Sequence, residues 1–263
     1  MFVYIFLLGL IVGSFVNVVI YRVPRGQSVV AGRSMCVYCR VKISWFDLIP
    51  IVSFLLLMGK CRNCDRKISW VYPIVELYSG IIFLFAFISN QPDIVTRIFL
   101  VFILELLLVL ALTDLKNLIL PDSILLVVLL GTVAYGIFEH WVGSYSFNIF
   151  SLENIAGIVV LFSILFIPWF LSKGAWLGFG DVKLSGLVGL VFGIWGGLII
   201  FYGALIFGMA VALILLASRQ ANLKTKLPLG TFISFSATVY IFWGSSIQNK
   251  IAGLFYSVPL IFK

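Results

Sequence analysis

Residues 97–138 read RIFLVFILELLLVLALTDLKNLILPDSILLVVLLGTVAYGIF, and this stretch decides the class of fold. It holds two apolar runs, at 97–113 and 122–138, separated by a short segment that begins at Asp114. Each run approaches the roughly 20 apolar residues that an α-helix needs to cross a bilayer. The stretch therefore predicts two consecutive transmembrane helices joined by a short loop.

The same pattern continues in both directions along the chain and predicts an all-α polytopic membrane protein. About eight transmembrane helices are expected, at 1–20, 71–89, 97–113, 122–138, 154–171, 183–197, 198–217 and 229–246. Closely spaced glycines mark the sixth and seventh of these, and small residues let helices approach closely in lipid, which favours a packed hairpin. Gly9 and Gly13 form a GxxxG pair in the first helix, which we interpret as a helix-packing motif.

The composition excludes a soluble globular protein. Hydrophobic residues make up 62% of the chain and charged residues 11%, and the mean hydropathy is +1.18. A soluble domain has about 45–50% apolar and about 25% charged residues. The first apolar run has neither the basic start nor the small-residue cleavage site of a signal peptide, so we expect it to be a retained span.

The net charge of +8 is explained by topology. If the N-terminus lies outside, loops 22–70, 114–121, 172–182 and 218–228 face the cytoplasm, and most of the 18 Lys and Arg residues lie in or beside them. This distribution follows the positive-inside rule. The basic balance therefore indicates cytoplasmic loops facing anionic lipid, and no nucleic-acid partner is expected.

All four cysteines lie in loop 22–70, as two CxxC pairs: Cys36 with Cys39, and Cys61 with Cys64. Two such pairs about 20 residues apart are typical of a tetrahedral Cys₄ zinc site. Structural disulfides are unusual in a reducing cytoplasm. We therefore predict a structural zinc ion bound by these four thiolates, with a redox role as the alternative. The metal-stapled loop would either have no chemistry of its own or bind the substrate.

The cysteine pairs belong to an internal repeat, because residues 36–45 and 61–70 both read CxxCxxKISW. The repeat predicts two similar knuckles around one metal. The apolar segment 46–58 between them is too short to span comfortably and contains Pro50. If it crossed the membrane, the two pairs could not share a metal, so we expect an interfacial or re-entrant segment.

Two aspartates carry the predicted catalytic chemistry. Asp114 closes the third span, and Asp181 opens the sixth after Gly178 and Gly180 in a GxGD sequence. Counting spans places both at the inner membrane face. Two nearby carboxylates can share one proton, so the ionised member activates a water while the protonated member donates to the scissile carbonyl. The pattern predicts an aspartic protease, and His140, the single histidine, is expected on the outer side.

The other acids at the spans have simpler interpretations. Asp122 follows Pro121 and is expected to begin a helix. Glu105 lies in the middle of a span, and its spacing from Asp114 turns it to another face of the helix. Glu76 lies one turn into the second span, where it binds either a cationic group or another part of the bundle. Lys116 and Lys183 are expected to reach toward lipid headgroups.

Two other functions compete with proteolysis. Aspartates in membranes often serve ion or proton transport, which would require acids spread through the bilayer depth. A zinc-anchored assembly factor of a pilus or secretion machine would need the cysteines but neither Asp114 nor Asp181. Substitutions of Asp181 and Cys61 separate these alternatives.

Taken together, the motifs resemble the bacterial type IV prepilin peptidases, which act as leader peptidase and N-methyltransferase. The resemblance begins in Gly13-Ser14-Phe15-Val16-Asn17 and runs through the paired CxxC loop. It continues in Tyr72-Pro73-Ile74-Val75-Glu76, in the aspartates from Asp114 to Asp122, and in Gly178-Phe179-Gly180-Asp181. These motifs extend through almost the whole chain.

The resemblance implies a bifunctional enzyme with Asp114 and Asp181 as catalytic residues. It would be a multi-pass protein of the bacterial cytoplasmic (inner) membrane. Its substrates would be prepilins or pseudopilins, cut at the cytoplasmic face and then N-methylated with S-adenosylmethionine, in pilus biogenesis, type II secretion or competence. The implied divisions are a first helix at 1–21, a cytoplasmic zinc-binding loop at 22–70 linked to methylation, and a peptidase core at 71–263. Glu76 is our candidate for contact with the methyl donor.

One motif departs from the family pattern. The chain reads Pro228-Leu229-Gly230-Thr231, where the family more often has PFGP. The departure leaves the predicted protease intact and concerns the detailed contacts with the substrate.

Overall fold

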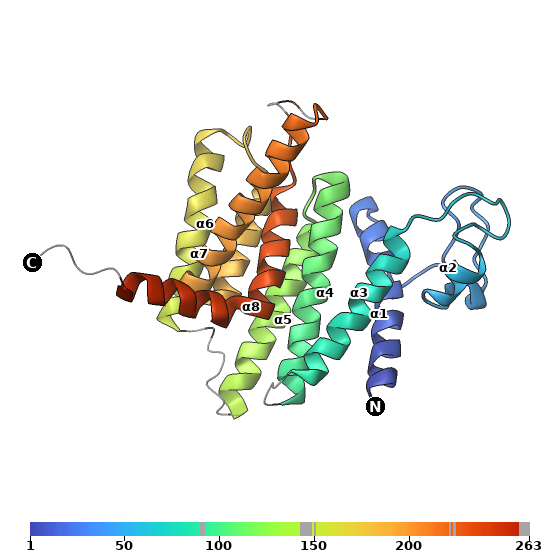
Figure 1. The fold of residues 1–263 in the computed structure, drawn as a ribbon, viewed down its shortest axis with the longest axis horizontal. Coiled ribbons are helices and arrows are strands. Elements are labelled where there is room, and N and C mark those ends of the chain that lie inside the picture. Colours follow the sequence, from blue (N-terminus) through green and yellow to red (C-terminus); the bar gives the residue numbers. More distant parts are fainter. Residues whose placement is uncertain (90–92, 143–148, 150, 221, 223–224, 258–263) are drawn as a thin grey trace, which may run out of the picture. The chain divides into compact units, whose positions relative to one another are not determined.

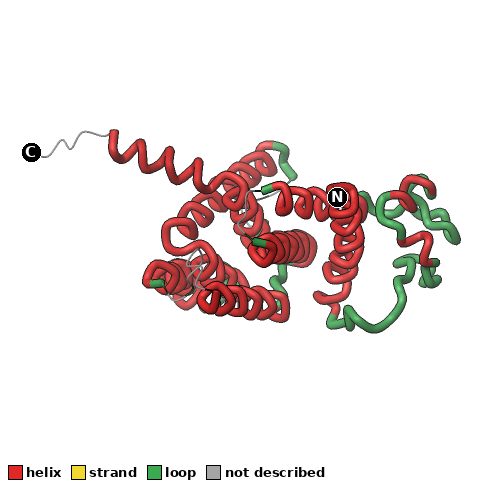
Figure 2. The backbone as a smooth tube through the Cα atoms, turned by 90° about the horizontal axis from the view of Figure 1, so that it is seen from below, coloured by secondary structure: helices red, strands yellow, loops and turns green. Residues whose placement is uncertain are grey.

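The computed structural model describes residues 1–89, 93–142, 149, 151–220, 222 and 225–257. Within these residues there is no β-strand, and the chain is helical, as predicted (Figures 1 and 2). The helices are α1 (Phe2–Arg22), α2 (Val52–Leu56), α3 (Val71–Ile88), α4 (Ile94–Asn117), α5 (Asp122–Val142), α6 (Leu152–Leu171), α7 (Phe179–Ala217) and α8 (Leu229–Ser257).

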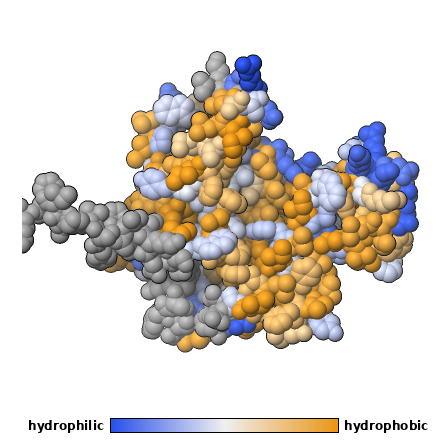
Figure 3. Space-filling view, in the orientation of Figure 1, coloured by the Kyte–Doolittle hydropathy of each residue, from blue (hydrophilic) through white to orange (hydrophobic). Residues whose placement is uncertain are grey.

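Six of these helices, α1 and α3–α7, are long and apolar enough to cross a membrane. Hydrophobic residues cover much of their outer surface in Figure 3, while hydrophilic residues gather at helix ends and over the loops. Exposed large side chains such as Leu126, Leu130, Ile206 and Leu213 suit lipid and would be unfavourable in water. The predicted class, a polytopic all-α membrane protein, is confirmed.

The chain divides into two compact units, Met1–Val109 and Leu110–Lys263. In the first unit, α1 and α3 meet through the GxxxG pair. A side chain on Gly9 would come within 2.8 Å of the Gly80 Cα, and one on Gly13 within 2.7 Å of the Glu76 Cα. Only hydrogen at these positions permits such an approach, so the predicted packing role of the pair is confirmed.

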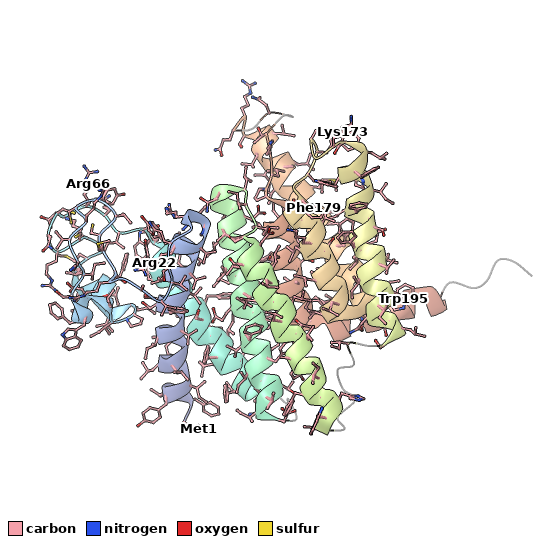
Figure 4. All side chains as sticks on the ribbon, turned by 180° about the vertical axis from the view of Figure 1, so that it is seen from behind. Met1, Arg22, Arg66, Lys173, Phe179 and Trp195 are labelled. Carbon is pink, nitrogen blue, oxygen red and sulfur yellow. The ribbon has the colours of Figure 1, made fainter. Side chains whose placement is uncertain are left out.

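In the second unit, α7 is a hairpin. Gly193 has φ 67° and ψ −175°, which breaks the helix. At 1.5 Å per residue, a continuous helix would separate Gly189 from Gly197 by about 12 Å. A Cβ atom on Gly197 would instead lie only 3.6 Å from the Gly189 Cα, so the two residues are neighbours and the chain reverses direction between them. Figure 4 shows the result: Phe179 lies toward one end of the unit, with Lys173, and Trp195 lies toward the other.

The two helices predicted at 183–197 and 198–217 are therefore the arms of this hairpin, and the expected boundary was wrong by a few residues. The chain turns at Gly193 because this combination of φ and ψ is accessible almost only to glycine. The hairpin arms account for two spans, and the apolar part of α8, Leu229–Gly244, is shorter than the others.

The turn is supported by α6, which begins at the same end of the unit. Breaking the helix frees the carbonyl of Leu190, and the Asn154 side-chain amide donates to it at 2.9 Å. A side chain on Gly189 would overlap the backbone carbonyl group of Gly157, so α6 and α7 touch backbone to backbone. An unsatisfied carbonyl in the membrane costs several kcal/mol, which Asn154 avoids.

Substituting Gly193 by Ala is expected to lower the melting temperature of the detergent-solubilised chain by several degrees. An alanine would be strained at this backbone conformation by about 1–3 kcal/mol, and its Cβ would lie 3.2 Å from Glu153 Cγ. Gly186→Ala is the matched control, since its Cβ would make a 3.4 Å contact with Phe162. Equal melting temperatures for the two variants would contradict a strained turn at Gly193.

Candidate active site and metal site

Asp114 lies in the last turns of α4 and is 5% exposed. Its Oδ2 accepts a hydrogen bond from the backbone N–H of Thr231 at 2.8 Å. Thr231 is the third residue of α8, so this bond joins two helices that are far apart in sequence. The start of α8 thereby fixes the Asp114 carboxylate.

Asp181 is the third residue of α7, whose N-cap is Gly178. The Asp181 N–H donates to the Gly178 carbonyl at 3.2 Å, and its Oδ2 would lie 3.6 Å from a side chain on Gly178. The carboxylate therefore bends toward the N-terminus of its own helix. Free N–H groups and the helix dipole at this end favour a negative charge.

The structure brings Asp114 and Asp181 together. Asp181 interacts electrostatically with Asp114, and the backbone of Gly230 faces both carboxylates. Three segments meet here: the end of α4, the start of α7 and the start of α8. The sequence predicted that the end of α4 and the start of α7 meet, through Asp114 and Asp181. That α8 also contributes is seen only in the structure.

Leu120 holds these three segments at close range. A side chain on Gly180 would come within 3.0 Å of the Leu120 Cβ, and one on Gly230 within 2.8 Å of the Leu120 Cδ1. Leu120 is itself buried. The second glycine of GxGD is thus required by packing, because it admits Leu120 beside the aspartates.

A pair of carboxylates in a buried site can catalyse hydrolysis without a metal. The ionised carboxylate accepts a proton from water as the water oxygen attacks a peptide carbonyl, and the protonated carboxyl donates its proton to the carbonyl oxygen. Both groups here are held by backbone contacts, which is the preorganisation that such a mechanism needs.

The other acids predicted at the spans lie elsewhere. Asp122 is the first residue of α5, and its Oδ1 pairs with Lys183 Nζ at 2.7 Å. The expectation that Lys183 reaches only toward lipid was therefore incomplete. This pair is largely exposed and stabilises the fold by at most about 1 kcal/mol.

Glu105 and Glu76 are both buried within the first unit. Ser79 donates to Glu105 Oε2 at 3.0 Å, and Glu105 Oε1 has no hydrogen-bond partner among the described residues. Glu76 Oε2 accepts the N–H of Ile51 at 2.8 Å. Of the two roles considered for Glu76, the structure shows a contact with another part of the protein, which ties the cysteine loop to α3.

The four cysteines form one cluster. Their sulfur atoms lie within 4.8 Å of one another, which suits a single metal ion. Four tetrahedral zinc–sulfur bonds of about 2.3 Å would place the sulfurs about 3.8 Å apart, and Cys36 Sγ lies 3.9 Å from Cys64 Sγ. The residues therefore fit a tetrahedral thiolate site.

The internal repeat builds this cluster from two matching knuckles. In the first, the Cys36 N–H donates to Val41 O at 3.0 Å and Arg40 N–H to Cys36 O at 2.9 Å. In the second, the corresponding bonds are Cys61 to Arg66 at 2.9 Å and Asp65 to Cys61 at 3.0 Å. The predicted pair of knuckles around one site is present in the structure.

Hydrogen bonds within the cluster favour a thiolate at Cys36. Burial alone raises the pKa of Cys36, but the backbone N–H groups of Cys39 and Tyr38 and the neighbouring thiols together lower it to about 7. The pKa of Cys64 is about 11: the backbone N–H of Arg66 lowers it, while burial and the other thiols raise it. A bound divalent cation would favour the thiolate at every position.

The segment between the knuckles does not span the membrane. It forms a short 3₁₀ turn (Trp45–Leu48) and α2, and the shared cysteine cluster keeps both of its ends on one side. Trp45, Leu56, Met58 and Trp70 are each more than half exposed. These side chains match the predicted interfacial segment, because tryptophan and apolar residues favour the headgroup region.

Comparison with known proteins identifies the family. A model of the bacterial peptidase A24 N-terminal domain matches residues 7–90, and a model of the type IV leader peptidase family matches residues 99–213. The prepilin leader peptidase/N-methyltransferase of Bacillus subtilis (strain 168) is 31% identical over 92% of this chain and 94% of its own length. This chain belongs to the type IV leader peptidase family.

Other relatives with the same name agree. That of Vibrio cholerae is 35% identical to this chain over 72% of the chain and 76% of the relative. That of Myxococcus xanthus is 34% identical over 85% of the chain and 66% of the relative. No solved structure matches the chain. The resemblance inferred from the motifs is confirmed, and with it a multi-pass membrane protease of the prepilin peptidase type.

Sequence reasoning missed the contact of Thr231 with Asp114. Nothing local to residues 228–231 indicates a partner in α4. The bonds from the Asn154 amide to the Leu190 carbonyl and from the Ile51 N–H to the Glu76 carboxylate were also missed. All three join residues that are distant in sequence.

Proposed function

We propose that this chain removes the leader from type IV prepilins or pseudopilins with Asp114 and Asp181 as its catalytic pair. The observation that carries the proposal is the meeting of the two carboxylates, from separate helices, beside the backbone of Gly230. The family membership and the prepilin leader peptidases among the relatives support the substrate class.

In the proposed reaction, one carboxylate takes a proton from water, and the water oxygen bonds to the scissile carbonyl carbon. The other carboxyl gives its proton to the carbonyl oxygen. The tetrahedral intermediate then breaks its C–N bond, and a proton passes to the leaving nitrogen, which becomes the new N-terminal amine. No metal takes part in these steps.

The amine released in this way is the acceptor for the second activity, N-methylation. The donor would be S-adenosylmethionine: its methyl group forms a bond to the amine nitrogen, its sulfur leaves as a thioether, and the amine loses a proton. Loop 22–70 is proposed to serve this activity, with Glu76 as a candidate contact for the cationic sulfonium. The peptidase core is proposed to be residues 71–263.

Zinc is proposed as the ion held by Cys36, Cys39, Cys61 and Cys64. Four thiolates close its tetrahedral coordination, which is typical of a structural ion. We also propose that the active site faces the cytoplasm, since the basic loops follow the positive-inside rule for this orientation.

The product masses test both activities. Purified prepilin is incubated with the detergent-solubilised chain, with and without S-adenosylmethionine. We expect loss of the leader in both reactions, and the added mass of a methyl group only when the donor is present. Cleavage without the added mass would leave a dedicated protease. An intact prepilin in both reactions would refute the proposed function.

A further inference from the structure

The first turn of α8 is attached to α4 at two points, both through Thr231. Its backbone N–H donates to Asp114 Oδ2 at 2.8 Å. Its hydroxyl lies 2.9 Å from the carbonyl oxygen of Ala111 and 3.4 Å from Asp114 Oδ2. A hydroxyl has one proton, and the shorter distance assigns it to Ala111.

These bonds restrict the carboxylate in two ways. The N–H bond limits rotation of the Asp114 side chain, and the hydroxyl bond fixes α8 to the backbone of α4 one helical turn before Asp114. Asp114 is buried and Thr231 is partly buried, which limits competition from water for these bonds. The N–H is available because the first N–H groups of a helix have no partner within it.

The preceding residue, Gly230, has no room for a side chain that could bind Asp114 in place of Thr231. A side chain on Gly230 would come within 3.0 Å of Asp114 Oδ2 and within 2.8 Å of Leu120. The backbone of α8 therefore approaches the carboxylate directly, and Thr231 is the first residue after this approach that carries a side chain.

Both bonds use groups that threonine has and proline lacks. Proline has no N–H and no hydroxyl, so it could make neither bond. We propose that Thr231 is a positioning residue for Asp114 in this chain, holding the carboxylate in its reactive orientation through the N–H and holding α8 against α4 through the hydroxyl. The inference rests on the proposed proteolysis.

Thr231→Pro removes both bonds, and the fold should tolerate it. Thr231 is the third residue of α8, so its N–H makes no hydrogen bond within the helix. A proline ring clashes with the carbonyl four residues earlier only inside a helix, and Leu227 precedes α8. Thr231→Val keeps the N–H and the shape but lacks the hydroxyl. Thr231→Ser keeps both donors and serves as the matched control.

We expect kcat for prepilin cleavage to fall about 10- to 100-fold in Thr231→Pro and about 3- to 10-fold in Thr231→Val, because misplacement of a reacting group by about 1 Å can cost 100-fold. Thr231→Ser should keep kcat close to the wild-type value. KM should stay the same in all three variants, since Thr231 acts through Asp114 and not on the substrate.

The experiment measures kcat, KM and melting temperature for the full-length wild type, the three Thr231 variants and Asp114→Asn in detergent. Wild-type kcat in Thr231→Pro would overturn the inference, and so would a rise in KM with unchanged kcat. Lower melting temperatures with unchanged kcat per folded molecule would show a purely structural role and overturn it as well. Cleavage by Asp114→Asn would instead refute the proposed protease, independently of Thr231.

Discussion

Asp181→Asn and Asp114→Asn are each expected to reduce prepilin cleavage by at least about 1,000-fold, because a general acid or base contributes about 100- to 10,000-fold and the two carboxylates act as a unit. Asparagine has nearly the same shape as aspartate but cannot accept a proton from water. In Asp114→Asn the Thr231 N–H can still donate to the amide oxygen, so both variants should fold.

Cleavage rates of the purified variants, measured beside their melting temperatures, test this expectation. Asp122→Asn is the matched control: it removes a carboxylate at the first residue of α5 that pairs with Lys183 and lies outside the proposed catalytic pair. Its cleavage rate should be close to that of the wild type. Full cleavage by Asp114→Asn and Asp181→Asn would end the aspartic-protease interpretation and favour ion transport.

Cys61→Ser is expected to lower the zinc content from about one ion per chain to well below it, because a tetrahedral structural site requires four ligands. The same substitution should make loop 22–70 more susceptible to proteolysis. Metal binding supplies much of the folding free energy in small zinc modules, about 10–16 kcal/mol in zinc-finger peptides. The knuckles contain few buried apolar side chains, with Phe54 as the buried residue of α2, so the ion carries much of their stability.

Elemental analysis of the purified chain and limited proteolysis measure these two effects. Asn63→Ser is the control, since it changes the same knuckle without removing a thiol. Removal of the metal with a chelator should reproduce the proteolysis pattern of Cys61→Ser. Stoichiometric zinc in Cys61→Ser would show that the four cysteines do not form the predicted site.

The two substitutions also separate the alternative functions. A zinc-anchored assembly factor would be impaired by Cys61→Ser and unaffected by Asp181→Asn. The proposed enzyme predicts that Asp181→Asn loses cleavage while retaining its zinc, because the cysteine cluster and the aspartates belong to different units of the chain.

Much of this fold could be predicted because the bilayer imposes it locally. A span needs about 20 apolar residues in one continuous run, so hydropathy alone locates most of the helices. The metal site was equally local, since each CxxC pair brings its two thiols together and the repeat relates the two pairs. The aspartates stood out because charged groups are rare at membrane depth.

The tertiary structure decided what depends on contacts between distant residues. It placed the turn of the hairpin at Gly193, where glycine alone accepts the backbone conformation, although several glycines nearby were equally plausible from sequence. It joined Thr231 to Asp114, Glu76 to Ile51 and Lys183 to Asp122. Hydropathy and spacing set the length and chemistry of each helix, but the helices meet through close contacts and hydrogen bonds whose partners no local pattern specifies.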